Sequence, residues 1–189
     1  SRLVALSPQA LLAQLSDRLR MLGNGPTDAP ARQQTMRAAI SWSYDLLSPE
    51  LQAFYRAISI FPGSFSFEQV AAVTADRAID PLEGLTALIE ASLVQPELGP
   101  DDERRYRMLE TIRTFGVELL SASNEAARVR EAFVQQMLLL ADDAFDGMQS
   151  PNQQTWLLRL DAEIDNTRAV LRYLLDTRDH HRAQQLARG

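Results

Sequence analysis

The chain of 189 residues contains no cysteine and no lysine, and each absence excludes a class of chemistry. Without cysteine the chain forms no disulfide and has no thiolate nucleophile, which permits a reducing compartment. Without lysine it has no Schiff-base amine and no phosphate-loop lysine. All 19 basic residues are therefore arginines, and these residues supply no covalent amine or thiol catalysis.

The chain is also poor in aromatic residues, at 7%, and in glycine, with eight, while 46% of its residues are hydrophobic. This composition favours a mainly helical protein. No apolar run approaches the roughly 18 residues that a membrane span needs. We expect a cytoplasmic protein without membrane contact. Because the sequence begins and ends inside helical pattern and shows no leader, we also expect a piece of a longer protein.

Negative charge is concentrated in the middle of the chain. The formal net charge is -6, and residues 61–123 carry five arginines against eleven acidic residues. Such an imbalance disfavours partners rich in phosphate within that third of the chain.

A densely specified helical pair lies between Ala39 and Pro62. Ser48 followed by Pro49 predicts a helix start, because serine caps the first free amides and proline suits the first helical position. Apolar residues at helical spacing precede and follow this joint: Ile40, Tyr44 and Leu47, then Leu51, Phe54, Tyr55 and Ile58. Of these residues we expect Tyr44, Leu47, Phe54 and Tyr55 to be core, with Phe61, Phe65, Leu88, Leu93 and Met108.

The following segments predict short elements in a definite order. A helix at residues 66–74 precedes one at residues 80–92, whose apolar side holds Leu82, Leu85, Leu88 and Ile89. Two extended pieces, residues 93–98 and 105–109, flank a polar tip and predict a hairpin. A further helix is expected from Glu110 to Ser121. Helices followed by a hairpin are the order of a winged helix.

Long helices are expected before and after this region. Residues 8–22 predict a helix that ends a preceding domain. Residues 125–145 and 152–177 predict two long helices, with Trp156, Leu160, Ile164, Leu171 and Leu174 on the stripe of the second. The break at residues 147–151 indicates an antiparallel helical hairpin, which is the first unit of a helical array in our interpretation.

Three segments together resemble one known family. They are the run from ARQQTMRAAISWSYDLL to FSFEQVAAV, the run LTALIEASLVQ, and the run RYRMLETIRTFGVELL, which lie in order within residues 31–120. They are similar to the winged helix of signal-transducing STAND ATPases, the class of the NB-ARC receptors and of many bacterial LuxR-type or SARP-type transcriptional regulators. The run WLLRLDAEIDNTRAVLRYLL at 156–175 resembles the entry to their tetratricopeptide-like (TPR-like) region.

The resemblance implies a fold and a domain plan. The fold is mainly α, a winged helix with a small β-hairpin followed by the antiparallel helical hairpin that begins a TPR-like array. Residues 1–25 would end a helical domain, residues 26–123 would be the winged helix, and residues 124–189 would start the TPR-like region. The partners would be an upstream nucleotide-binding domain and downstream helical repeats, with a protein or small-molecule inducer. ATP or ADP would bind the parent protein, and this piece would hold no cofactor and catalyse nothing.

One family motif maps to Met108, Leu109 and Glu110. In NB-ARC receptors the matching histidine reaches the phosphate of ADP, and leucine cannot donate that hydrogen bond. The resemblance implies nucleotide sensing at these three positions. The alternative is that Glu110 caps the helix that starts there, because a carboxylate interacts favourably with the first helical turn.

Two other function classes stay open. A winged helix invites DNA binding, but the helix in the recognition position contains Asp80, Glu83 and Glu90 with no arginine, so we expect no DNA contact. Arg104, Arg105 and Arg107 form a small basic cluster near the wing. A helical adaptor that binds a partner protein is the other alternative.

Paired charges elsewhere are interpreted as solvated. His180 and His181 point about 100° apart on a helix and are not expected to bind metal. The acidic residues Asp161, Glu163 and Asp165, beside Arg159 and Arg168, predict a charged outer helix face. Our prediction is a non-catalytic regulatory segment that couples a nucleotide-binding module to a helical sensor scaffold.

Overall fold

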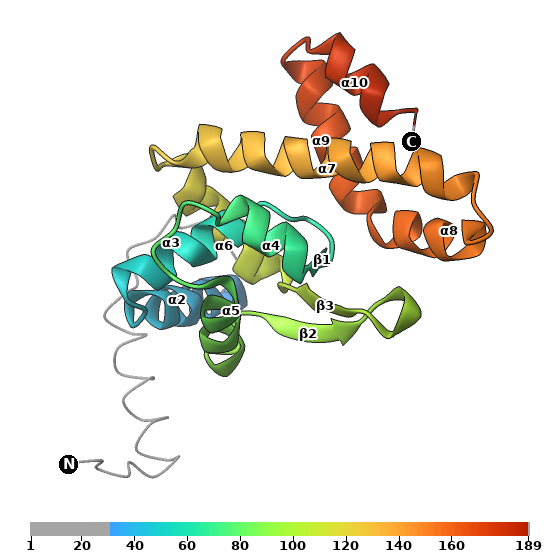
Figure 1. Cartoon of the computed structure of the whole chain (residues 1–189). Coiled ribbons are helices and arrows are strands. Elements are labelled where there is room, and N and C mark those ends of the chain that lie inside the picture. Colours follow the sequence, from blue (N-terminus) through green and yellow to red (C-terminus); the bar gives the residue numbers. More distant parts are fainter. Residues whose placement is uncertain (1–30, 189) are drawn as a thin grey trace. The chain divides into compact units, whose positions relative to one another are not determined.

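The computed structural model describes residues 31–188, so the predicted helix at residues 8–22 and the predicted domain of residues 1–25 lie outside the described residues. The chain divides into two compact units after Leu46. The described part of the first unit is helix α2 (Ala31–Asp45). Ile40 and Tyr44 on α2 are buried, as their spacing predicts. Figure 1 labels this helix and those of the second unit.

The second unit begins with a winged helix, and the predicted order of its elements is confirmed. Three strands form one antiparallel sheet in the order β1-β3-β2, with Phe65 opposite Tyr106 and Glu97 opposite Arg105. The two-residue strand β1 was not predicted. The elements are α3 (Pro49–Ile58), β1 (Phe65–Ser66), α4 (Phe67–Val73), α5 (Pro81–Glu90), β2 (Gln95–Leu98), the 3-10 turn η1 (Pro100–Asp102), β3 (Arg104–Arg107) and α6 (Glu110–Ser121).

Local capping explains where these helices begin. The Ser48 hydroxyl accepts a hydrogen bond from the amide of Leu51 at 3.3 Å, and Pro49 follows it as the first helical residue. The Asp80 carboxylate accepts from the amide of Leu82 at 2.9 Å. Ser66 and Gln69 form a reciprocal capping box at the start of α4. Each cap satisfies amides that the first turn leaves without a helical partner.

The winged helix packs around aromatic side chains. The Phe61 and Phe65 rings stack with centroids 4.9 Å apart, and the Phe65 and Tyr106 rings stack at 6.2 Å. The Tyr55 hydroxyl donates to the carbonyl of Ile112 at 2.5 Å, which ties α3 to α6. Of the predicted core of this unit, Leu47 is half-buried and the following residues are buried: Phe54, Tyr55, Phe61, Phe65, Leu88, Leu93 and Met108. Leu51 and Ile58, at helical spacing on the same face of α3, are buried too.

The apolar side predicted for α5 is wrong at one position. Leu82 is 59% exposed, whereas Leu85 and Leu88 are buried. Gly84 takes the missing place in the interior, because a Cβ there would lie only 2.7 Å from the Phe54 ring. Because glycine has no side chain, the backbone of α5 lies directly against the Phe54 ring at this position. The spacing of the leucines alone does not predict that contact.

Four further helices follow where two were predicted. They are α7 (Ala126–Met148), α8 (Gln153–Ala162), α9 (Ile164–Asp176) and α10 (His180–Leu186). The single helix predicted for residues 152–177 is wrong, because Glu163 interrupts it with a non-helical ψ of 2°. The break also leaves Ile164 43% exposed, although it was assigned to the apolar stripe.

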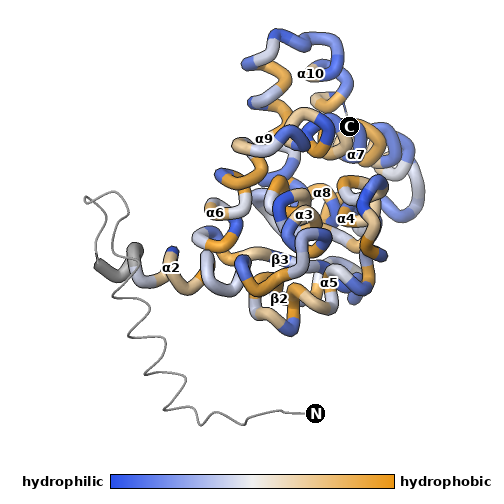
Figure 2. Tube along the Cα trace, turned by 90° about the vertical axis from the view of Figure 1, so that its left-hand side faces the viewer, coloured by the Kyte–Doolittle hydropathy of each residue, from blue (hydrophilic) through white to orange (hydrophobic). Residues whose placement is uncertain are grey.

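Helix α7 runs between the winged helix on one side and α9 and α10 on the other, as Figure 1 shows. Phe133 on α7 contacts Phe61 edge to face at 5.0 Å. Figure 2 colours the residues by hydropathy, and both apolar and polar residues occur on α9 and α10. At its end a Cβ on Gly147 would overlap the indole of Trp156, so α7 and α8 meet closely. No helix within residues 31–188 has the length and apolarity to cross a membrane.

Candidate functional site

The recognition position of the winged helix is occupied by an acidic helix. Helix α5 exposes Leu82, Glu83, Thr86 and Glu90 to solvent. None of its ten residues is basic, so its exposed surface offers no cation to a phosphate. The place of this helix in the fold agrees with the prediction from the sequence.

The three arginines of the wing strand β3 differ in environment. Arg104 is exposed, and the Arg107 side chain is 56% exposed and donates to Glu97 at 3.0 Å. Arg105 lies between them and is only 4% exposed. The predicted basic cluster is therefore wrong for its central member, because Arg105 points into the protein.

Arg105 donates into a buried polar network. Its Nε donates to the Ser64 hydroxyl at 2.9 Å, and its Nη2 donates to the Ser64 carbonyl at 2.9 Å and to Glu163 Oε1 at 2.5 Å. Glu163 is 3% exposed. Placing Glu163 on a charged outer face is therefore wrong, because the break between α8 and α9 turns this carboxylate inward.

Asn166 completes the same network from the first turns of α9. Its Nδ2 donates to Glu163 Oε2 at 2.7 Å and to the Ser64 carbonyl at 2.8 Å, while its Oδ1 accepts from the Gly63 amide at 3.0 Å. Asn166 is fully buried. Three segments distant in sequence thus share one network, namely the loop before β1, strand β3 and the α8–α9 joint. Buried polar groups need such partners, and here each carboxylate oxygen of Glu163 has one.

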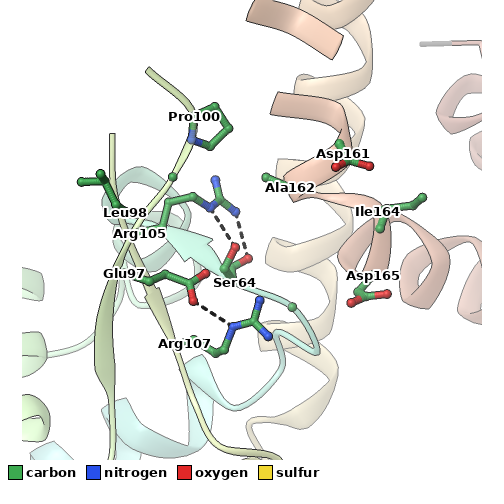
Figure 3. Close-up of a pocket in the computed structure, with 12 residues that line it drawn as sticks. Ser64, Glu97, Leu98, Pro100, Arg105, Arg107, Asp161, Ala162, Ile164 and Asp165 are labelled. Carbon is green, nitrogen blue, oxygen red and sulfur yellow. Dashed lines mark hydrogen bonds and ion pairs between the residues drawn. The ribbon is translucent and has the colours of Figure 1, made fainter. Parts of the chain in front are cut away.

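A shallow cavity of about 270 Å³ opens beside this network. Figure 3 shows Arg105 pointing toward Ser64 and Arg107 toward Glu97, with Asp161 and Asp165 on the facing helices. The lining carries charges of both signs, and its two arginines already bond carboxylates. The cavity therefore shows no charge preference for a ligand.

A second, more exposed ion-pair cluster joins the winged helix to the start of α7. Glu125 bonds Arg77 at 2.9 Å and Arg56 at 3.3 Å, and its side chain is 20% exposed. Partial burial would raise the pKa of Glu125, but the hydrogen bonds and charges of Arg77 and Arg56 together lower it. This cluster holds the start of α7 against the winged helix.

The three positions matched to the nucleotide motif are spread over different environments. Met108 is buried after β3, and Leu109 is 49% exposed at the start of α6. Glu110 accepts hydrogen bonds from Arg113 at 2.9 and 3.0 Å and from Thr114 at 3.2 Å. The Arg113 hydrogen bond lowers the pKa of Glu110. Its carboxylate thus bonds side chains of the first turn, and the structure records no side-chain cap at Leu109.

The two histidines lie at the start of α10, and both are exposed. Within residues 31–188 no three histidine or acidic side chains lie close enough together to hold a metal ion. No sequence pattern predicts the ion pair of the Arg105 network. Arginine and glutamate 58 positions apart carry no periodicity, and only the unusual asparagine on an otherwise apolar stripe of α9 marks the site.

Comparison with known proteins supports the winged helix. Residues 47–121, from the start of α3 through α6, match the family described as "Winged helix-turn-helix domain". A protein of Mycobacterium tuberculosis with the provisional name of HTH-type transcriptional regulator is 35% identical over 193 aligned positions, and a Mycobacterium bovis protein with the same provisional name matches equally. An uncharacterized Mycobacterium tuberculosis protein is 33% identical over 134 positions.

These relatives are much longer than this chain. The first two matches cover 99% of the chain but 21% of each relative, and the third covers 68% of the chain and 34% of the relative. No solved structure matches the chain at a significant level. Residues 47–121 thus form a winged helix, and the chain is similar to parts of longer proteins whose names describe them as transcriptional regulators.

Proposed function

We propose that this chain is a non-catalytic regulatory segment of a larger transcriptional regulator of the STAND type. In this role the winged helix couples an upstream nucleotide-binding module to the helices that follow it. The relatives' names support the regulatory part of the proposal. In this proposal the nucleotide module and the output domain lie in the rest of the parent protein; the relatives, of which this chain spans 21%, are long enough to hold them.

The main support for the proposal is that the wing packs against the protein's own helices. In a DNA-binding winged helix the wing and its cations face the duplex. Here Arg105 is buried against Glu163, and the wing tip η1 contacts α8. The wing therefore contacts the protein's own helices, as expected of a module that transmits movement between domains.

The charge of α5 supports the same conclusion. Affinity for DNA depends largely on cations that neutralise phosphates, and α5 brings three acidic groups, counting Asp80 at its start. Inserting this helix into a major groove would oppose like charges. A protein surface with complementary charge is a better partner for α5 than a nucleic acid.

DNA binding is the second candidate function, and the match to a winged helix-turn-helix family favours it. Fluorescence anisotropy with a labelled mixed-sequence duplex at about 20 mM salt separates the two candidates, because non-specific binding is strongest at low salt. We expect no saturable binding by the chain. Saturable, salt-sensitive binding would instead support the DNA-binding function.

A matched variant tests the reason for the expected result. Replacing Glu83 and Glu90 by arginine reverses the charge on the exposed face of α5 and leaves its buried residues unchanged. If acidity is the barrier, this variant gains salt-dependent affinity for the duplex. Equal behaviour of the two proteins would mean that α5 is not the surface that faces DNA.

The nucleotide part of the proposal is tested on the full-length parent. We expect it to retain ADP or ATP through purification, measured by chromatography of the denatured protein. Nucleotide sensing by Met108, Leu109 and Glu110 is part of this proposal. Leu109→His restores the donor of the related motif and is expected to slow nucleotide release roughly ten- to a hundred-fold, since a hydrogen bond to a charged group contributes about 1.5–3 kcal/mol. An unchanged release rate argues against these positions.

A helical adaptor is the remaining alternative, and the exposed apolar residues of α7 and α8 favour it. Leu139, Phe145 and Leu157 are each more than half exposed. An adaptor would bind its partner through α7–α10 without any nucleotide. A partner captured equally well by the parent with and without bound nucleotide would favour this function over ours.

A further inference from the structure

We propose that Arg105, Glu163 and Asn166 form a polar latch that makes the wing and the α8–α9 joint open and close together. The wing is the segment from β2 to β3, and the joint is the end of α8 with the first turns of α9. The latch itself follows from the contacts below, whereas its use in signalling rests on the proposed function.

The polar side chains of the latch find their hydrogen-bond partners within the protein. Glu163 bonds Arg105 through one carboxylate oxygen and Asn166 through the other. The Asn166 amide also donates to the Ser64 carbonyl, which Arg105 bonds as well. Removing any member therefore leaves a buried partner without its hydrogen bond, and in the case of the ion pair leaves a buried charge. Such a network holds one geometry in preference to nearby alternatives.

Little apolar packing holds the wing against the joint. Helix α8 buries none of its residues, and Asn166 is the first buried residue of α9. The buried apolar residues of α9, Val170 and Leu174, lie one and two turns further along. The wing and the joint are therefore held together mainly by polar groups. A region with few buried apolar contacts opens at a lower free energy than the core.

Two glycines permit a close approach of the backbone to the latch. A Cβ on Gly99 would overlap Cδ of Arg105, and a Cβ on Gly63 would lie 3.3 Å from Oδ1 of Asn166. The backbone thus approaches both ends of the latch more closely than other residues allow. The φ of Gly99 is -96°, so its small size rather than an unusual backbone conformation matters there.

In this proposal the latch has a closed and an open state, and the wing and the α8–α9 joint change between them together. In the closed state the three side chains bond one another. When the α8–α9 joint moves away, Glu163 leaves and Arg105 loses its buried counter-charge, so β3 is destabilised where it pairs with β1 and β2. A ligand or partner that displaces the joint would therefore loosen the wing, and one that displaces the wing would loosen the joint.

Hydrogen-deuterium exchange of this chain, followed by mass spectrometry, tests the coupling. Arg105→Met breaks the latch from the wing side. Glu163→Gln breaks it from the joint side, because it removes the charge and places an amide donor opposite the Asn166 amide. We expect either variant to speed exchange at least tenfold in peptides covering both residues 93–107 and residues 153–170. Peptides of α3 and α6 keep their protection.

Arg107→Met is the matched control, since Arg107 lies on the same strand in an exposed ion pair with Glu97. We expect it to leave both regions unchanged. If Arg105→Met unfolds the chain, Ser64→Ala removes a single hydrogen bond to Arg105 and should speed exchange in the same two regions by a smaller factor.

Three outcomes would overturn the latch. In the first, each variant loosens only its own side. In the second, exchange rises uniformly, including α3 and α6, in the Ser64→Ala protein too. In the third, neither region changes. None of these results depends on nucleotide or DNA, so the proposed function and the latch fail separately.

Discussion

Two ion pairs on the wing strand have the same chemistry and opposite environments. The side chains of Arg105 and Glu163 are 5% and 4% exposed, and they meet at 2.5 Å at the joint of α8 and α9. Arg107 and Glu97 are 56% and 34% exposed at 3.0 Å, on the outer part of the hairpin. Both arginines lie on β3 with one residue between them, so the strand places one in the interior and leaves the other in solvent.

At these two positions the burial of the ion pair decides what the arginine contributes. Water and salt screen the outer pair, which therefore contributes little. The inner pair is shielded, and its value lies in the geometry that it fixes and in the cost of breaking it. The same residue type on one strand is thus a surface charge at one position and a connector between segments at the other.

The largest expected effect is that of Arg105→Met on stability. It leaves the Glu163 carboxylate buried without its counter-charge, and we expect a loss of about 3–5 kcal/mol in the free energy of unfolding. Urea denaturation measures it. The double variant Arg105→Met, Glu163→Met removes both charges and should recover most of the loss. If the single variant loses less than about 1 kcal/mol, the pair is solvated in solution.

Gly99→Ala is expected to have an intermediate effect, because it disturbs the inner pair without changing a charge. Its Cβ would displace the Arg105 side chain, and overpacking of this kind costs about 1–3 kcal/mol. Thermal unfolding with the Gly99→Ala, Arg105→Met double variant checks the mechanism. If the clash is with Arg105, the two effects are not additive; simple additivity would place the strain elsewhere.

Arg107→Met is expected to change stability by less than about 1 kcal/mol, because its pair with Glu97 is exposed. The measurement is the same urea titration, repeated at low and high salt. A loss comparable to that of Arg105→Met would remove the distinction between the two pairs.

The smallest effect concerns a third carboxylate and arginine, Glu110 and Arg113. The hydrogen bond from Arg113 lowers the pKa of Glu110 below its ordinary 4.5. A lowered folded-state pKa contributes stability above the unfolded value, and that stability is lost as the pH falls through the folded value. Arg113→Met should raise the pKa of Glu110 toward 4.5, measured by NMR titration of its carboxyl carbon. An unchanged titration would show that the pair does not persist in solution.

Much of the winged helix is encoded in local residues and was predictable. Ser48-Pro49 and Asp80-Pro81 start helices by capping chemistry that acts within three residues. The polar tip between residues 98 and 104 marks the hairpin in the same local way. Such signals need no knowledge of the rest of the fold.

The polar network was not predictable, because its causes lie far apart in sequence. Strand β1 has two residues and exists through its pairing with β3, so periodicity cannot detect it. The break at Glu163 has no proline or glycine to mark it, and the hydrogen bond to Arg105 accompanies it. Neighbouring charged residues on a helix normally indicate a solvent-exposed face. Only the bond to Arg105, 58 positions away, shows that Glu163 is buried instead.

The close meeting of Gly147 with Trp156 has a practical consequence for optical work. The chain has two tryptophans, and Trp42 belongs to the other compact unit. A Trp42→Phe protein would therefore emit from one indole at the corner of α7 and α8, with the Arg159 guanidinium 5.3 Å from the ring centroid. Its fluorescence would follow the helical scaffold alone, which makes movement there visible without an attached dye.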